Sequence, residues 1–187
     1  MQGWWVASYI VLWLLVVALC VVVVALARQI GTLHLRLGPR GALEIDDEGP
    51  PLGEAAAIID ATDGKGEAVT IGRPGAGQLL LFVTPGCRVC DEVLPGIGAV
   101  ARAGNLSPYV ITDGIQEWDG YETVNARSVS SSEAFRAFAV PGTPYAVVVD
   151  DMGIVRAKGT VNNLEQMEGL VESAIKRADA SPPARAS

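Results

Sequence analysis

The chain has 187 residues, half of them hydrophobic, and a formal net charge of −7 at pH 7. This length suits one ordinary domain plus an attachment. The negative charge and the lack of a basic cluster argue against a nucleic-acid partner. The single histidine, His34, cannot form a metal site by itself and is expected on the surface.

An uncharged stretch of 22 residues runs from Val6 to Ala27. It is long enough to cross the hydrocarbon core of a membrane as a helix. Trp4 before it and Arg28 after it suit the two interfaces. The alternative is a cleaved signal peptide ending at Ala25-Leu26-Ala27, but the apolar run is long for one and no Lys or Arg precedes it. Residues 1–28 are therefore predicted to be a transmembrane anchor.

A juxtamembrane linker is predicted over residues 29–54, because Gly38-Pro39-Arg40-Gly41 breaks any helix. Its end, Asp46 to Pro51, combines acidic residues with Gly and Pro and predicts a solvated, semi-stiff spacer. Residues 55–177 are assigned to the domain. Residues 178–187 are small and contain proline, which predicts a disordered tail.

The domain is expected to begin with a strand pair. Two short apolar runs, Ile58–Ala61 and Ala68–Ile71, flank the turn Asp63–Gly66. A buried strand follows at Leu79–Val83, because this run is short, apolar and bounded by turn residues.

Two cysteines follow this strand after the break Thr84-Pro85-Gly86. Cys87 lies at the first turn of a predicted helix and Cys90 one turn later, so the two can close a small disulfide ring. The positive helix N-terminus favours the thiolate of Cys87. A lone pair at this spacing is a redox motif. We therefore expect thiol–disulfide exchange, with Cys87 attacking and Cys90 resolving.

Arg88 lies between the two cysteines. It either stabilises the Cys87 thiolate, which would make the pair more oxidising, or is a solvated arginine without consequence.

The rest of the domain is predicted to alternate strands and helices. The expected elements are the strands Tyr109–Thr112, Tyr145–Asp150 and Ile154–Arg156 and the helices Cys87–Ala103, Glu133–Phe138 and Leu164–Arg177. Between Asp113 and Ser130 only turn signals stand out. Trp118 and Tyr121 in this stretch are either packing groups or part of the rim of the site.

The chain resembles the thioredoxin-like family in several motifs. Cys87-Arg88-Val89-Cys90 matches its C-x-x-C site, Pro95 its helix-kinking proline, Thr143-Pro144 its cis-proline, and Asp151-Met152-Gly153 its following hairpin turn. The resemblance implies an α/β fold with a central mixed sheet flanked by helices and an added N-terminal hairpin. The membrane segment, the juxtamembrane RQIGTLHLRLGPRGAL and the site TPGCRVC look most like the membrane-anchored TlpA-type and methylamine-utilisation (MauD-like) thiol-disulfide proteins.

This resemblance also implies a substrate site. Pro144 in cis would expose the backbone of Thr143 beside Cys87 for pairing with an extended substrate; the alternative is an ordinary trans proline. The implied function is disulfide exchange with a protein client, in maturation of an extracytoplasmic redox protein, with a membrane redox partner to recycle the pair. No cofactor is needed, because the cysteine pair itself carries two electrons.

The sequence departs from the family near Cys90. Leu81 and Val93 stand where relatives place an aspartate or a glutamate, and Asp91 and Glu92 are expected to face solvent. The usual acid–base helper is therefore missing, which favours a narrow task with one partner protein.

The side of the membrane is contested. Arg28, Arg36 and Arg40 follow the segment and no Lys or Arg precedes it, so the positive-inside rule places the domain in the cytoplasm. The resemblance implies the extracytoplasmic side, which is the prediction adopted.

Two other functions remain open. A peroxiredoxin-type peroxidase would need P-x-x-x-T-x-x-C, in which Thr84 and Cys87 match but Leu80 replaces the proline. The second alternative is a non-catalytic tethered module that holds a partner or a metal. No histidine lies in the domain, and Cys90 is followed by Asp91 rather than by the histidine of a haem attachment motif.

Overall fold

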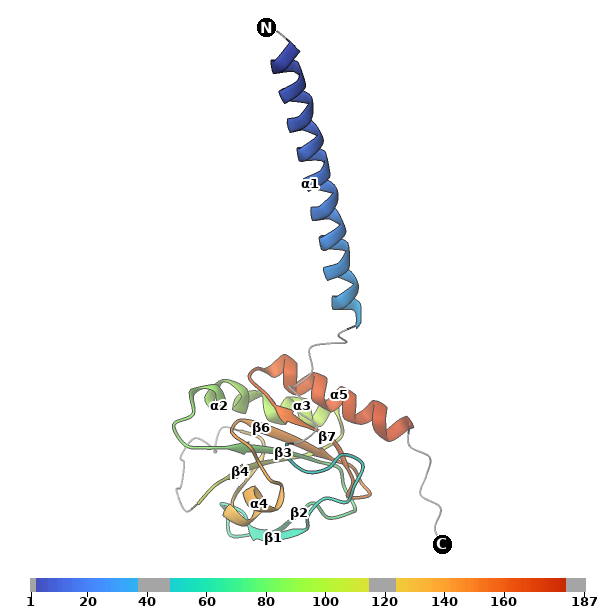
Figure 1. Ribbon diagram of the computed structural model, residues 1–187. Coiled ribbons are helices and arrows are strands. Elements are labelled where there is room, and N and C mark those ends of the chain that lie inside the picture. Colours follow the sequence, from blue (N-terminus) through green and yellow to red (C-terminus); the bar gives the residue numbers. More distant parts are fainter. Residues whose placement is uncertain (1–2, 37–47, 115–123, 181–187) are drawn as a thin grey trace. The chain divides into compact units, whose positions relative to one another are not determined.

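The computed structural model describes residues 3–36, 48–114 and 124–180 of the chain. The chain divides into two compact units, residues 1–39 and residues 40–187. The first unit is one helix and the second is the domain that carries the cysteine pair (Figure 1).

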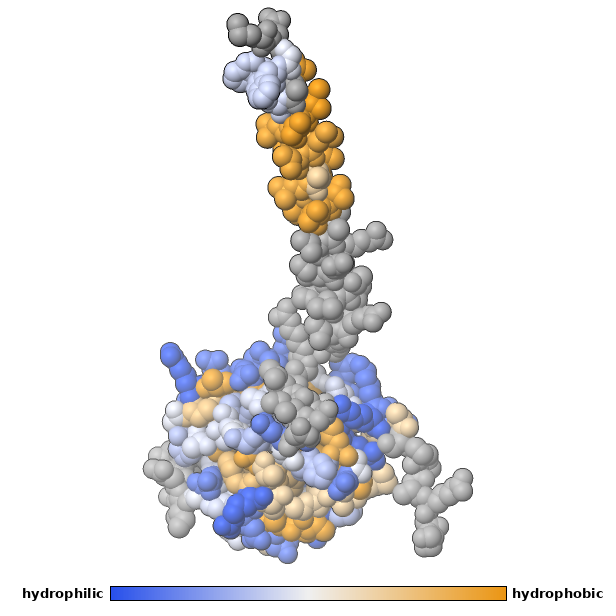
Figure 2. All heavy atoms as spheres, in the orientation of Figure 1, coloured by the Kyte–Doolittle hydropathy of each residue, from blue (hydrophilic) through white to orange (hydrophobic). Residues whose placement is uncertain are grey.

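Helix α1 spans Gly3–Arg36, 34 residues, or about 51 Å at 1.5 Å per residue. Its stretch Gly3–Val23 has the length and composition to cross a membrane, a test that a signal sequence also passes. After the paler first turns, exposed apolar side chains cover the helix, in orange in Figure 2. The helix continues eight residues beyond Arg28, into the segment expected to be a linker.

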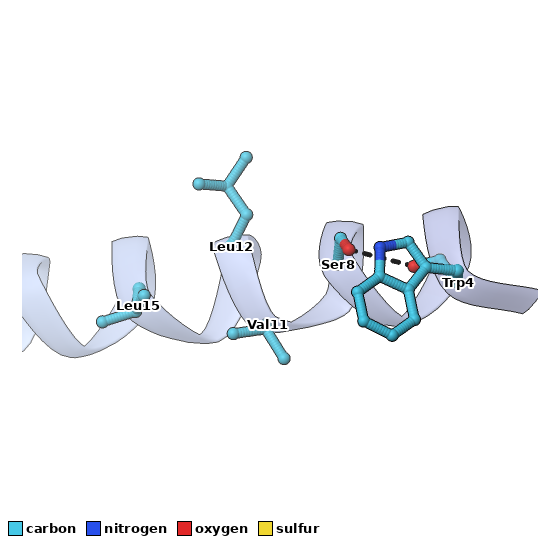
Figure 3. A pocket seen from close by; sticks show the side chains of 5 residues that line it. All are labelled: Trp4, Ser8, Val11, Leu12 and Leu15. Carbon is cyan, nitrogen blue, oxygen red and sulfur yellow. Dashed lines mark hydrogen bonds between the residues drawn. The ribbon is translucent and has the colours of Figure 1, made fainter.

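A shallow hollow lies beside the first turns of α1 (Figure 3). Ser8 Oγ donates a hydrogen bond to the carbonyl oxygen of Trp4, at 2.9 Å, and so stays within the helix surface. The other lining side chains, Val11, Leu12 and Leu15, are apolar. The hollow is thus an exposed helix face.

The domain is built on a five-stranded mixed sheet in the order β5-β4-β3-β6-β7. Strands β3, β4 and β5 are parallel, and β6 and β7 are antiparallel to their neighbours. This confirms the predicted mixed sheet. The strands are β3 (Gln78–Val83), β4 (Ser107–Thr112), β5 (Arg127–Ser130), β6 (Tyr145–Val149) and β7 (Val155–Thr160).

Both faces of the sheet are covered, as Figure 1 shows. One face carries α2 (Arg88–Val93), α3 (Ile97–Ala103) and α5 (Leu164–Ala180); the other carries α4 (Ser132–Ala137) and the hairpin of β1 (Ile59–Thr62) and β2 (Ala68–Ile71). Successive side chains of a strand point to opposite faces. Leu79 and Leu81 of β3 therefore join the core under the first set of helices, and Leu80 and Phe82 join the core under the hairpin. A strand buried on both faces reads as the continuous apolar run seen in the sequence.

Side chains cap the N-termini of two helices in the domain. Ser131 Oγ accepts from the backbone N–H of Ala134 at 3.1 Å and begins α4. Asn163 Oδ1 accepts from the N–H of Gln166 at 2.9 Å, and Gln166 Oε1 accepts from the N–H of Asn162 at 2.7 Å. This arrangement, which satisfies free N–H groups at the start of α5, is a variant of a capping box, because Gln166 accepts from the residue before Asn163 rather than from Asn163 itself.

Strand β5 was not predicted. It lies at the edge of the sheet, and the hairpin protects this edge, because Gly64 N–H donates to the Ser128 carbonyl oxygen at 2.9 Å and Asp63 forms a bridge with Val129. An open edge would invite pairing with another chain. The added hairpin therefore completes the domain as well as covering its core.

The end of the expected spacer packs against the domain. Lys158 Nζ donates to the carbonyl oxygen of Glu48 at 2.7 Å, and the hydroxyl of Tyr145 donates to the same oxygen at 3.3 Å. Lys158 is 1 % exposed and Pro50 is buried. From Glu48 onward the chain is therefore part of the folded domain rather than a solvated spacer. At the other end, α5 continues three residues beyond Arg177.

The turn of the hairpin is expected to make the stability of the domain depend on pH. Asp63 Oδ1 accepts from the backbone N–H of Glu67 at 2.9 Å and of Lys65 at 3.0 Å. The Glu67 bond is the main cause that lowers the pKa of Asp63 from 3.8; burial opposes it and the Lys65 bond adds to it. Because the pKa of Asp63 is lower in the folded state than in the unfolded state, ionised Asp63 stabilises the fold fully at any pH above its unfolded-state pKa. This stabilisation is lost as the pH falls through the folded-state pKa.

We expect the free energy of unfolding to fall less between pH 7 and about pH 3 in Asp63→Asn than in the unsubstituted chain. Urea unfolding followed by far-UV circular dichroism measures this. The exposed Asp113→Asn is the control and should keep the full acid-dependent loss. Equal acid sensitivity of Asp63→Asn and Asp113→Asn would contradict the role of the turn.

Candidate active site

A disulfide joins Cys87 and Cys90, whose Cα atoms lie 5.2 Å apart, just after the end of β3. The predicted ring between these residues is therefore present. β3 places it at the C-terminal edge of the parallel strands, where loops of α/β folds carry their functional groups.

Cys87 is the N-cap of α2. Its backbone is extended, and its Sγ accepts from the backbone N–H of Cys90 at 3.2 Å. Its own N–H donates to the carbonyl oxygen of Thr84, at 3.2 Å. An N–H aimed at this sulfur at a helix start favours negative charge on it. The geometry thus supports the thiolate at Cys87 that the sequence predicts.

The two cysteines differ in exposure. Cys90 is fully buried, at 0 %, whereas Cys87 is half-buried. A sulfur that attacks another protein must reach solvent, and one that resolves the mixed disulfide works from inside. The arrangement therefore suits the predicted order of attack.

Pro95 interrupts the helix that carries the site. After α2 the chain forms a turn of 3₁₀ helix at Leu94–Gly96, labelled η1, and then continues as α3. Proline lacks the N–H that a continuing α-helix requires. The single helix expected from Cys87 to Ala103 is thus two α-helical pieces joined at the predicted kink.

Gly86 sets the turn into the cysteine pair. Its φ is +77°, a region that side chains with a Cβ rarely adopt, and a Cβ built there would have nothing within 4 Å. Conformation rather than lack of space therefore calls for glycine here.

The loop before β6 lies beside the loop before Cys87. The Thr143–Pro144 peptide bond is cis, as the resemblance implies. Thr143 Oγ1 donates to Thr84 Oγ1 at 3.0 Å and so links the two loops. The contact between Thr84 and Thr143 was not predicted; the available signal was that both threonines directly precede a proline.

The hydroxyl pair Thr84–Thr143 should be measurable by a double-mutant cycle. Removing both hydroxyls by Thr→Val should cost less than the sum of the single changes, with a coupling of about 0.5–1.5 kcal/mol in urea unfolding, because a lone hydrogen bond contributes that much. Thr143→Ser keeps the hydroxyl and should lose little. Additive single effects would show that the two groups do not interact in solution.

The charged residues near the pair point outward. Arg88, Asp91 and Glu92 are exposed. Leu81 and Val93, where the resemblance implies an acid, are fully buried in the apolar cluster that holds Cys90. These two positions therefore supply no acid–base group, as the sequence indicates.

The remaining expectations concern metal ligands, two aromatic residues and the third cysteine. Within residues 3–36, 48–114 and 124–180, no three His, Cys, Asp or Glu side chains gather in a way that could hold a metal ion. Trp118 and Tyr121 lie outside the described residues. Cys20 is exposed on α1.

Similarity to known sequences covers nearly the whole chain. The chain is 40% identical to the methylamine utilization protein MauD of Paracoccus denitrificans over 181 residues. This alignment covers 92% of the chain and 90% of the relative. The chain is also 40% identical over 176 residues to MauD of Methylorubrum extorquens, covering 90% and 85% respectively. No family model matches the chain.

Solved structures resemble the domain. The thioredoxin domain of a thiol-disulfide oxidoreductase from Bacteroides vulgatus matches with a TM-score of 0.55 and 20% identity, over 66% of this chain and 96% of that one. A thio-disulfide isomerase from Thermus thermophilus matches with a TM-score of 0.55 and 23% identity, over 68% and 97%. These matches show the thioredoxin-like fold.

Proposed function

The chain belongs to the MauD family and has the thioredoxin-like fold, and on this premise we propose that it is a thiol-disulfide oxidoreductase that exchanges disulfides with a protein client through Cys87 and Cys90. The observation that carries the proposal is the asymmetry of the pair. One disulfide joins a half-buried residue that caps a helix to a fully buried residue one turn later.

The exchange runs in two balanced steps. The Cys87 thiolate attacks one sulfur of a client disulfide, and the other client sulfur leaves as a thiolate. Cys90, after losing its proton, then attacks Cys87 Sγ and expels the second client thiolate. Two electrons pass to the client, the pair becomes the disulfide, and two protons complete the client thiols. The same steps in reverse oxidise a client.

Thr143 and Pro144 form the proposed client site. Pro144 is buried and Thr143 half-buried, and Thr143 is tied through Thr84 to the loop of Cys87. No hydrogen bond joins the main chain of Thr143 to another described residue. These backbone groups can therefore pair with an extended client segment next to Cys87.

Arg88 is proposed to stabilise the Cys87 thiolate, because it is an exposed cation adjacent to it in sequence. Removing the charge by Arg88→Gln should make the reduction potential of the pair about 5–20 mV more negative, the range that corresponds to a solvent-screened interaction of about 0.2–1 kcal/mol. Equilibration with glutathione measures it. The exposed Arg102→Gln on α3 is the control. Equal reduction potentials for Arg88→Gln and Arg102→Gln would show that Arg88 does not influence the cysteine pair.

Helix α1 is proposed to anchor the chain in the cytoplasmic membrane with the domain on the extracytoplasmic side. Its apolar, exposed surface and its length support the anchor. Arg28, Arg36 and Arg40 oppose this orientation under the positive-inside rule. Fusions at the C-terminus to alkaline phosphatase, which is active only outside the cytoplasm, and to a fluorescent protein that matures inside decide the side.

The client is proposed to be an extracytoplasmic redox protein during maturation, with a membrane partner that recycles the pair. The activity itself is tested with the reduced full chain in detergent and a peptide that contains one disulfide. The expected result is one peptide disulfide reduced for each Cys87–Cys90 disulfide formed. No exchange, with the fold intact, would support a tethered binding module instead.

A further inference from the structure

A second candidate site lies at the far end of the sheet from the disulfide. A cleft of about 520 Å³ opens between the hairpin and the first residues of the parallel strands. Gln78, the first residue of β3, lines it, whereas the disulfide follows the last residue of that strand. The cleft is therefore separate from the redox site.

Three side chains that can bind an anion reach this cleft. Tyr109 and Arg127 are neighbours in register on β4 and β5, so their side chains lie on the same face of the sheet, the face that the hairpin covers. Arg73, from the loop between β2 and β3, lines the cleft as well. Residues from three separate parts of the chain thus converge there.

These three side chains have few hydrogen-bond or ion-pair partners among the described residues. Arg127 has one ion pair, to Glu67 at 3.7 Å, in which both side chains are more than half exposed. Among the described residues, neither Arg73 nor the hydroxyl of Tyr109 has a hydrogen-bond or ion-pair partner. Tyr109 is nine-tenths buried, and a buried tyrosine usually finds a partner for its hydroxyl.

The other polar groups of the cleft are already satisfied. Thr70 Oγ1 donates to Asp60 Oδ1 at 2.7 Å. Gln78 accepts from Gly72 N–H at 2.7 Å and donates to the carbonyl oxygen of Thr70 at 3.1 Å. The groups without a partner are therefore the guanidinium of Arg73 and the phenol of Tyr109, and the guanidinium of Arg127 has only its exposed ion pair with Glu67; all three donate hydrogen bonds.

We propose that this cleft binds the carboxylate of an acidic peptide segment from a partner protein. Two arginines and one aspartate line it, so the lining carries one net positive charge; Glu67, the partner of Arg127, lies outside the lining and is more than half exposed. A carboxylate balances that charge, whereas a phosphate dianion would exceed it. Guanidinium groups match the planar geometry of a carboxylate.

The size of the cleft favours a peptide over a free small acid. Sites for ligands of drug size measure roughly 300–1,000 Å³, and this cleft falls within that range at about 520 Å³. One carboxylate fills only a small part of it. The remaining space accommodates the residues that flank an acidic side chain.

The test uses the oxidised full chain in detergent and fluorescein-labelled penta-glutamate, with binding followed by fluorescence anisotropy. Arg73→Gln and Arg127→Gln should each weaken binding about tenfold, as expected for the loss of a charge-assisted hydrogen bond. Tyr109→Phe should weaken it less. The control is Arg102→Gln, an exposed arginine on α3, which covers the opposite face of the sheet, and it should bind as the unsubstituted chain does.

Three outcomes would overturn the proposal: no saturable binding, equal weakening by Arg102→Gln, or succinate that competes at the same concentration as the peptide. The last would assign the cleft to a small carboxylate. Because no electron transfer is involved, the result is independent of the proposed exchange. Exchange can fail while this binding persists, and the reverse also holds.

Discussion

Cys90→Ser is expected to accumulate a mixed disulfide with its client, whereas Cys87→Ser is expected to form none. The half-buried Cys87 can reach another protein, and the fully buried Cys90 can reach only Cys87. Without Cys90 the second step of exchange has no internal nucleophile, so the covalent intermediate persists. Turnover should fall to background in both variants, but only one should trap a partner.

The measurement is non-reducing gel electrophoresis of the full chain after reaction with a disulfide-containing peptide. Cys20 is an exposed thiol on α1, so every variant and its control should also carry Cys20→Ser. More of the mixed disulfide with Cys87→Ser than with Cys90→Ser would reverse the assigned roles. Equal amounts of it with the two variants would contradict them. Mass spectrometry of the trapped species identifies the sulfur that holds the peptide.

Phe82→Ala is expected to have the largest effect on stability. Phe82 of β3 is fully buried, with ring centroids 5.2 Å from Phe135 and 5.5 Å from Phe138. Deleting a buried phenylalanine ring removes its transfer free energy and leaves a cavity, a cost of about 3–5 kcal/mol. Because β3 leads directly into the loop of Cys87, the loss should also loosen the site.

Urea unfolding of the oxidised full chain measures this loss. The matched control is Met152→Ala, at a side chain that is 45 % exposed in the turn between β6 and β7, where a change within about 0.5 kcal/mol is expected. A loss below about 1 kcal/mol for Phe82→Ala would show that the core around β3 is not packed as described.

Much of the site could be predicted because its signals are local. The apolar run of β3, the turn before Cys87 and the spacing to Cys90 all lie within a dozen residues, and each has a direct physical meaning. The cis bond before Pro144 followed from family resemblance rather than from any local pattern.

The features that were missed depend on partners far along the chain. β5 has the sequence RSVS, with only Val129 buried, and its strand character comes from pairing with β4. β7 was expected to end at Arg156, whereas it extends to Thr160. It continues because Arg156 pairs with Asp150 at 2.6 Å and Lys158 donates to Glu48, 110 residues earlier. Partners such as these, one of them far along the chain, make buried charges tolerable.

The same reason hid the contact that Thr84 makes. Its partner Thr143 lies 59 residues later, and no spacing rule connects them. The two arginines of the cleft beside the hairpin, Arg73 and Arg127, likewise come together only when the hairpin covers the sheet. Tertiary contacts rather than local propensity decide these positions.

The most direct test of the proposed exchange is the reduction potential of the Cys87–Cys90 pair in the full chain, measured against glutathione. A single reversible two-electron transition is expected between roughly −270 and −120 mV. A value at the negative end would make the domain a reductant that needs electrons from a membrane partner, and one at the positive end would make it an oxidant. A pair that forms no reversible disulfide at any poise would contradict the account.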